Sequence, residues 1–238
     1  MEDIVQISEK LSYIKATENP LSADVIFVDG QEYLYVFDVG NNEEVAEYIN
    51  SIPKKKRIIL SHFHPDHMGN IGRVNFETVF FGANTEGYLQ NYIADYAKER
   101  FQDLPEALLK AFRDEDVNKK SCFAKYETVF EPIRIENGIS IEIHPMPNSH
   151  AKGSLLLQAD SKYILIGDSL YSKVKGDHYV YNAQLLKEEI TLLEKLPGTY
   201  IFSSHEREPV KGKAGVVRFL QSIYEKKTKS DTYIYIER

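Results

Sequence analysis

The stretch Ser61-His62-Phe63-His64-Pro65-Asp66-His67-Met68 places three imidazoles and one carboxylate within six positions. Imidazole nitrogen and carboxylate oxygen are ligands that a divalent ion such as zinc prefers. A polar surface loop is the alternative interpretation. Chance is a poor explanation for the pattern, however, because the chain has only 7 His among 238 residues. The stretch therefore predicts a metal site.

The residues before this stretch indicate how its side chains are directed. Arg57–Ser61 is a short run rich in β-branched residues, which is typical of a buried strand. Alternate side chains of an extended segment point the same way, so His62 and His64 can share one metal ion. Pro65 disfavours helix at His64 and can itself begin a helix. Asp66 and His67, which follow Pro65, then face another direction. The spacing therefore predicts two adjacent ligand sets rather than one.

Further ligand types stand at the ends of other apolar runs. His150 precedes one such run, whereas Asp168 and His205 each follow one. Asp38 likewise ends the run Tyr33–Phe37. A single His or Asp in such a place is usually a cap or a turn residue. Because loops at strand ends converge on one edge of a sheet, these side chains can meet, and their repetition favours metal ligands.

These five separated segments resemble the metallo-β-lactamase superfamily. The pattern from His62 to His67 matches its signature motif. His150 is similar to its third histidine element, Gly167-Asp168 to its bridging-aspartate segment, and His205 to its last histidine. The resemblance implies an α/β fold, a four-layered αββα sandwich with the site along one sheet edge.

The resemblance also implies a dinuclear ligand set. One metal would take His62, His64 and His150, the other would take Asp66, His67 and His205, and Asp168 would bridge them. Asp38 would support the ligands without binding metal itself. The bridging residue is aspartate, not the cysteine of one antibiotic-hydrolysing branch, and His64 stands where flavodiiron oxidoreductases carry glutamate. Both departures favour a hydrolase with two divalent ions, predicted to be zinc, and a metal set similar to those of glyoxalase II enzymes and lactonases.

The predicted chemistry is hydrolysis by a hydroxide that bridges the metals. Two divalent ions about 3.5–4 Å apart lower the pKa of a shared water to roughly 7. The hydroxide then attacks an electrophilic centre, and Asp66 is predicted to carry the proton to the leaving group. Tyr171, three residues after Asp168, has two interpretations. Its hydroxyl reaches the oxyanion, as in lactonases of the superfamily, or its ring only packs.

The predicted substrate is a small carbonyl compound, which is a thioester, an ester or a lactone. One alternative is a phosphodiesterase of the RNA-processing type, which Lys173, Lys175, Lys211 and Lys213 keep open. The net charge of −7 argues against general nucleic-acid binding, because phosphates demand a basic surface. A second alternative is a mononuclear iron dioxygenase of the persulfide-oxidising type. Metal content distinguishes it from a dizinc hydrolase.

Length and composition predict one domain spanning residues 1–238, with a mostly helical insertion at about 84–125. The single Cys122 forms no internal disulfide, so we expect a cytoplasmic protein. No apolar run approaches ~18 residues, so we expect no membrane span. The expected partner is a small-molecule substrate.

Periodicity and turn residues predict most of the remaining elements. Asp29-Gly30 predicts a tight hairpin turn, and the basic run Lys54–Arg57 predicts a solvated turn. His144 is interpreted as structural, and His178 as a weaker site candidate. Strands are predicted at Ile4–Ile7, Leu11–Lys15, Val25–Val28, Tyr33–Phe37, Thr78–Phe81, Ser140–Ile143, Ser154–Leu157, Tyr163–Ile166, Tyr200–Phe202 and Thr232–Ile236, and helices at 42–51, 84–116, 184–196 and 214–225.

Overall fold

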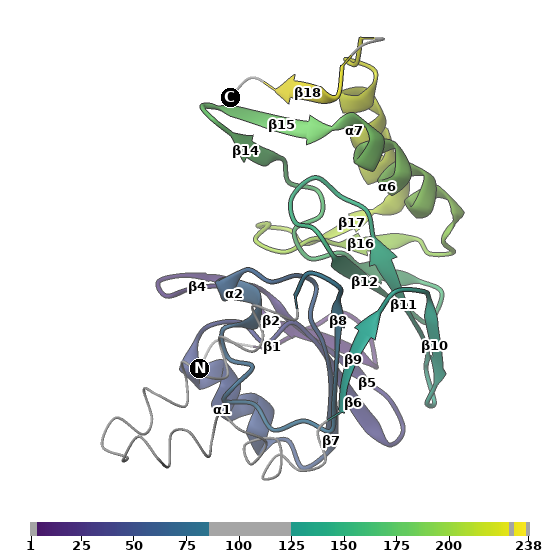
Figure 1. Cartoon of the computed structure of the whole chain (residues 1–238). Helices are drawn as coiled ribbons and strands as arrows, with labels where there is room; N and C mark the ends of the chain where they lie inside the picture. The colour runs from purple at the N-terminus through teal and green to yellow at the C-terminus, as the bar shows by residue number, and fades with distance from the viewer. Residues whose placement is uncertain (1–3, 86–124, 229–230, 237–238) are drawn as a thin grey trace. The chain divides into compact units, whose positions relative to one another are not determined.

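The computed structural model describes residues 4–85, 125–228 and 231–236. The chain divides into two compact units, residues 1–128 and 129–238, which Figure 1 colours purple to blue and teal to yellow. The predicted insertion at 84–125 lies almost wholly outside the described residues, as does Cys122. The single-domain prediction stays a prediction. Among the described residues, no helix combines the length and the apolar character needed to cross a membrane.

The first unit contains a seven-stranded sheet of order β1-β2-β5-β6-β7-β8-β9. Strands β1, β2, β5 and β6 pair antiparallel, whereas β6, β7 and β8 are parallel. A small two-stranded sheet, β3-β4, accompanies it. The strands are β1 (Ile4–Gln6), β2 (Leu11–Ile14), β3 (Thr17–Glu18), β4 (Leu21–Ser22), β5 (Val25–Asp29), β6 (Tyr33–Phe37), β7 (Lys55–Ile59), β8 (Thr78–Gly82) and β9 (Lys125–Val129).

Helix α1 (Glu43–Ser51) covers one face of this sheet. It begins where the Asn42 side chain accepts a hydrogen bond from the backbone of Glu44, which caps the first turn. Its apolar side places Val45, Ala46 and Ile49 in a core with residues of β5, β6 and β7. Burying a side chain the size of Val45 or Ile49 stabilises the fold by roughly 1.5–3 kcal/mol. This core holds the parallel strands whose ends carry the first ligands.

The second unit contains a six-stranded sheet of order β10-β11-β12-β13-β16-β17 and a three-stranded sheet, β14-β15-β18. Only β13 and β16 pair in parallel among the described strands of this unit. The strands are β10 (Ile133–Glu136), β11 (Ser140–Met146), β12 (Ser154–Ala159), β13 (Tyr163–Leu165), β14 (Lys173–Lys175), β15 (His178–Asn182), β16 (Tyr200–Phe202), β17 (Val210–Gly212) and β18 (Tyr233–Ile236).

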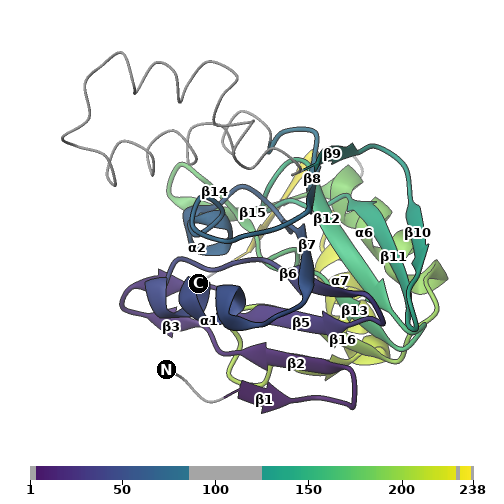
Figure 2. The ribbon, with the colours of Figure 1, turned by 90° about the horizontal axis from the view of Figure 1, so that it is seen from below.

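Helices α6 (Ala183–Lys195) and α7 (Lys213–Tyr224) lie side by side in this unit (Figures 1 and 2). The Asn182 side chain accepts hydrogen bonds from the first turn of α6, which fixes its start. Leu186, Leu193 and Leu220 are fully buried in a core shared with strands of both sheets. The unit therefore has one helical layer over a sheet, as the first unit does.

Most predicted strands and helices among the described residues are confirmed to within a few residues, but one local prediction is wrong. Lys55–Arg57 belongs to β7 instead of a solvated turn, because these residues pair in parallel with β6. Lys55 and Arg57 also lie 3.0 and 4.0 Å from the Glu77 carboxylate. The hairpin predicted at Asp29-Gly30 is confirmed between β5 and β6, where Asp29 is the last paired residue and Gly30 begins the turn. Seven of the described strands have no counterpart among the predicted ones, namely β3, β4, β9, β10, β14, β15 and β17.

Glu189 is an unusual member of the second unit's core. It is fully buried on α6, and neither carboxyl oxygen has a hydrogen-bond partner among the described residues. Burial raises the pKa of the Glu189 carboxyl well above its usual 4.5. Burial, with a smaller contribution from Glu189, also raises the pKa of Tyr181 to about 12. We conclude that Glu189 is held as a neutral acid well above the pH at which it ionises in the unfolded chain.

Glu189→Gln is expected to stabilise the protein, and the gain should grow with pH. Above about 4.5 the unfolded chain releases the Glu189 proton while the folded chain retains it, so folding stability falls as pH rises toward the folded pKa. The free energy of unfolding falls by at most about 1.4 kcal/mol per pH unit in this range. Urea unfolding at several pH values measures it. Glu188→Gln, on the exposed side of α6, is the control and should show no such gain. A Glu189→Gln variant that is less stable than the wild type at every pH would contradict the assignment.

Candidate metal centre

The first ligand group stands where two parallel strands end. Strands β6 and β7 are parallel, so their carboxyl ends reach the same sheet edge. The Asp38 backbone N–H donates to the Ile59 carbonyl at 2.8 Å, which ties the two ends together. Asp38 has φ 61° and Gly40 φ 65°, so the chain turns sharply after β6. The turn directs the Asp38 carboxylate at Ser61.

The short helix α2 (Pro65–Met68) follows the second of these strand ends. His64 is extended and Pro65 takes the first helical position, as the sequence predicts. The backbone N–H groups of Val39 and Gly40 donate to the His67 carbonyl at 2.9 and 3.1 Å. A Cβ on Gly69 would lie 2.2 Å from Asn41 Oδ1, so only glycine allows this close approach. The helix is therefore held against the turn that carries Asp38.

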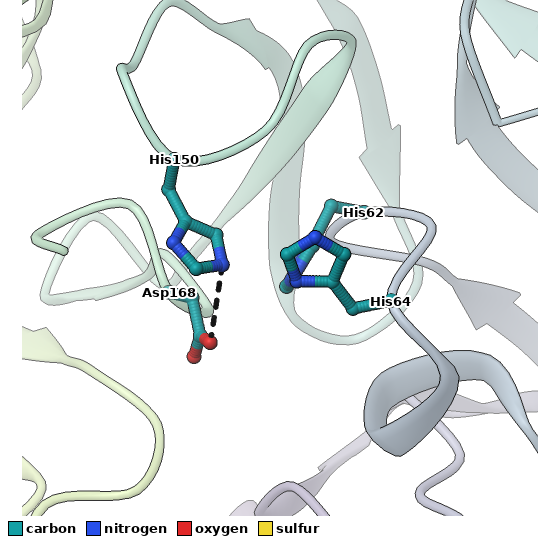
Figure 3. Close-up of side chains that lie close together, drawn as sticks. All are labelled: His62, His64, His150 and Asp168. Atoms are coloured by element: carbon teal, nitrogen blue, oxygen red, sulfur yellow. Dashed lines mark ion pairs between the residues drawn. The ribbon is translucent and has the colours of Figure 1, made fainter. Parts of the chain in front are cut away.

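The structure brings the motif residues together as two pairs. The rings of His62 and His64 have centroids 4.5 Å apart and lie beside each other in Figure 3. Each offers a ring nitrogen within 4.8 Å of the other's. In the second pair, His67 Nε2 lies 3.6 Å from Asp66 Oδ2. The unit thus presents two separate sets of donors, one on each side of Pro65.

Asp38 orients one of these imidazoles. His67 Nδ1 lies 2.7 Å from Asp38 Oδ2, and both side chains are almost completely buried. A carboxylate only accepts hydrogen bonds, so His67 Nδ1 carries a hydrogen and Nε2 is left for a metal ion. The Ser61 backbone N–H and hydroxyl also contact the Asp38 carboxylate, at 2.7 Å each. Sequence reasoning did not identify Ser61, because its side chain is not a usual ligand.

The second unit gathers its three candidates at one edge for a similar reason. Strands β13 and β16 are parallel, so Asp168 and His205, which follow them, stand at the same edge. Strand β12 runs antiparallel to β13, which brings its start, just after His150, to that edge too. The Ser204 backbone N–H donates to the Gly167 carbonyl at 3.0 Å and joins two of these loops. Segments far apart in sequence therefore meet through sheet pairing.

Asp168 presents one carboxylate oxygen to His150 and the other to His205. Oδ2 lies 3.5 Å from His150 Nε2, the contact dashed in Figure 3, and Oδ1 lies 3.9 Å from His205 Nε2. Both distances are long for hydrogen bonds. Two donors on one tetrahedral zinc ion stand roughly 3.4 Å apart, which is close to the first spacing. The arrangement suits a carboxylate that shares a cation with each imidazole.

The backbone at His205 and the Tyr171 side chain shape this edge further. His205 has φ 61°, a left-handed conformation that is uncommon for histidine. The Tyr171 hydroxyl donates to the Ser204 carbonyl at 2.8 Å and lies 3.5 Å from Glu206 Oε1. Its ring meets the His150 ring edge-on, with centroids 6.1 Å apart. Tyr171 therefore packs against one predicted ligand and bonds to the loop of another.

The other residues singled out in the sequence lie elsewhere in this unit. His144 is buried in β11, with Nε2 3.2 Å from Glu142. His178 stands in the exposed β14–β15 hairpin, and its ring lies edge-on to Tyr235. Three of the four lysines make contacts within the chain: Lys175 over the Tyr233 ring, Lys211 with Glu206, and Lys213 with the Leu196 carbonyl. Neither histidine belongs to the donor pairs above.

These donors fit a divalent metal ion. All are imidazole nitrogens or carboxylate oxygens, and within each unit they stand in pairs with ligand atoms less than 4.8 Å apart. His64, Asp66, His150 and His205 are half-buried, so water can reach the donor atoms. Each unit therefore contains pairs of His and Asp donors that suit a divalent ion.

A family model described as the metallo-β-lactamase superfamily matches residues 19–119. Solved structures of this superfamily align with most of the chain at low sequence identity. The chain has the metallo-β-lactamase fold. This confirms the predicted αββα fold class and the predicted resemblance to the superfamily. A comparison with curated proteins finds no match.

Three solved structures illustrate the similarity. An archaeal metallo-β-lactamase superfamily protein from Sulfolobus tokodaii is 17% identical with a TM-score of 0.60, and the alignment covers 92% of this chain and 88% of that one. A metallo-β-lactamase from Pontibacter korlensis is 16% identical, with a TM-score of 0.58 and coverage of 95% and 100%. A flavodiiron core from Synechocystis is 12% identical, with a TM-score of 0.65 and coverage of 94% and 61%.

Proposed function

We propose that this protein is a hydrolase with two divalent metal ions, zinc by preference, that cleaves a small thioester, ester or lactone. The arrangement of Asp168 carries the proposal, because its two carboxylate oxygens face two different histidines at 3.5 and 3.9 Å. A carboxylate so placed suits a bridge between two cations. A closed structural zinc site would need only four donors, whereas this chain offers seven.

The proposed ligand sets follow the pairs within each unit. His62 and His64 form one pair, and Asp66 and His67 form the other. Asp168 pairs with His150 through one oxygen and with His205 through the other. The proposed sets are His62, His64 and His150 for one ion, and Asp66, His67 and His205 for the other, with Asp168 common to both.

When bound, two such ions supply a water of lowered pKa and polarise the substrate oxygen. The protein side chains supply orientation and proton transfer. Asp38 keeps the His67 ring in the tautomer that leaves Nε2 available. Asp66 is half-buried, so its carboxylate can accept a proton and return it to the leaving group. The Tyr171 hydroxyl, which donates to the carbonyl of Ser204, is proposed to donate instead to the developing oxyanion.

The charge distribution favours a small carbonyl substrate over a phosphodiester. The net charge is −7, and Lys175, Lys211 and Lys213 already contact groups of the same unit. Three of the four lysines considered for holding a phosphate backbone are therefore already engaged. The proposed partner is a small-molecule substrate, and the proposed location is the cytoplasm, in keeping with a single cysteine.

A substrate panel with metal analysis tests the proposed function. Zinc-loaded protein is expected to bind about two zinc ions per chain and to hydrolyse lactones, esters or thioesters above the background rate. Phosphodiesters and β-lactams are included as competing classes. Activity confined to phosphodiesters would replace the proposal with the RNA-processing alternative. Purified protein that carries one iron ion per chain and consumes oxygen with persulfides would replace it with the dioxygenase alternative.

Asp168→Ala is expected to lower zinc affinity and hydrolysis together, because both ions lose a shared ligand. We expect kcat/KM to fall by more than about 100-fold, since even groups that only orient a metal ligand contribute 10–100-fold. Zinc per chain and hydrolysis rates measure the two effects. Asp177→Ala, in the exposed β14–β15 turn, is the control. Full metal content and activity in the Asp168→Ala variant would refute the bridging assignment.

Tyr171→Phe is expected to lower kcat by about 100-fold while zinc content stays unchanged, because a donor to the oxyanion is lost but no ligand is. Steady-state kinetics and metal analysis of the same preparation separate the two. Tyr224→Phe, at a tyrosine that packs on the second unit's core, controls for the loss of a hydroxyl elsewhere. Unchanged kinetics would assign Tyr171 to packing alone.

A further inference from the structure

Ser61 lies at the centre of a buried hydrogen-bond network that no ligand assignment uses. Its hydroxyl oxygen is 2.7 Å from Asp38 Oδ2, 2.9 Å from His62 Nδ1 and 3.2 Å from His67 Nδ1. These four residues have at most 1% of their surface exposed. Water therefore does not compete for these contacts, and the protein groups alone decide where the protons sit.

The proton positions follow from the donors available. The Asp38 carboxylate can only accept, so it takes the single hydroxyl proton of Ser61. Ser61 Oγ can then only accept from His62 Nδ1, which must carry a hydrogen. The reverse assignment, with Ser61 donating to His62, would leave two acceptor oxygens 2.7 Å apart with no proton between them. His62 is thereby held with its hydrogen on Nδ1 and its lone pair on Nε2.

We propose that Ser61 is a positioning residue that relays the Asp38 carboxylate to His62 and so fixes the tautomer in which His62 Nε2 binds metal. The proposal rests on the proposed metal-dependent function. The two imidazoles of the network differ in one respect. His67 reaches Asp38 directly at 2.7 Å, whereas His62 reaches it through Ser61. Loss of the Ser61 hydroxyl should therefore affect the ion bound by His62 and His64, and leave the ion bound by Asp66 and His67.

A structural role for Ser61 is the alternative. Its backbone N–H donates to Asp38 Oδ1 at 2.7 Å, and this contact alone ties the two strand ends. It survives any side-chain substitution except proline. If the hydroxyl only filled space, its removal would change stability and leave the His62 tautomer as it was. A measurement of the tautomer therefore separates the two roles.

The first experiment measures ring nitrogen shifts by long-range ¹H–¹⁵N NMR on metal-free protein at mildly alkaline pH, where imidazoles are neutral. Wild-type His62 is expected to carry its proton on Nδ1. Ser61→Ala should convert it to a mixture of tautomers, and Ser61→Thr, which keeps the hydroxyl, should restore the wild-type pattern. Thr78→Val, which removes another buried hydroxyl of the same sheet, is the control. A proton on Nε2 of His62 in the wild type would overturn the proposal without any variant.

The second experiment is zinc titration of the same proteins with a competing chelator. Ser61→Ala should weaken the binding of one of two zinc ions by about 10–100-fold and leave the affinity for the other unchanged. Ser61→Thr should restore the wild-type affinity. Equal affinities and an unchanged tautomer in Ser61→Ala would refute the relay. If the wild type binds no metal, the proposed function fails, while the tautomer measurement still decides the hydrogen-bond assignment. If Ser61→Ala does not fold, the tautomer of His62 in the wild-type protein decides the hydrogen-bond assignment.

Discussion

The carboxylate of Asp38 is the group on which the first ligand cluster depends. It is almost completely buried, and it accepts hydrogen bonds from the backbone and hydroxyl of Ser61 and from His67. A buried carboxylate is costly when its acceptor sites are unused, so each of these contacts lowers the cost of burying Asp38. They join the end of β6, the end of β7 and helix α2. Asp38 and His67, the outermost residues of this group, are 29 positions apart in sequence. The arrangement of these histidines in space thus depends on the way the ends of β6 and β7 meet at the sheet edge.

Asp168 has the corresponding place in the second unit, but its environment is different. The imidazole nitrogens of His150 and His205 stand at 3.5 and 3.9 Å from its carboxylate, whereas the groups around Asp38 approach to 2.7 Å. The short contacts of Asp38 suit the orientation of a neighbouring imidazole, whereas the longer spacings of Asp168 suit the bridging role proposed for it. Two buried aspartates of the same chemical type take different roles because their neighbours differ.

Much of the fold is readable from the sequence, because apolar runs, Pro65 and Asn42 act locally. Pro65 begins α2, and the run before His62 forms a strand, as predicted. Strand β14 was missed because Lys-Val-Lys is exposed throughout and has no buried face to reveal it. The basic start of β7 was misread because Glu77, its partner, is 22 residues from Lys55. Ser61 was missed for the same reason, since its role requires Asp38, which only the parallel pairing of β6 and β7 brings close. The predicted ligand roles remain predictions.

The left-handed backbone of His205 lowers folding stability but directs the imidazole ring toward Asp168. A residue with a Cβ at φ 61° costs about 1–3 kcal/mol, which glycine avoids. Stability alone would favour glycine at position 205, yet the His205 imidazole stands there 3.9 Å from the Asp168 carboxylate. The cost is met by the core of the second unit, whose buried leucines lie on α6 and α7. The protein therefore gives up part of its folding stability for one ring orientation, and a substitution that relieves the backbone at position 205 would gain stability and lose the imidazole that faces Asp168.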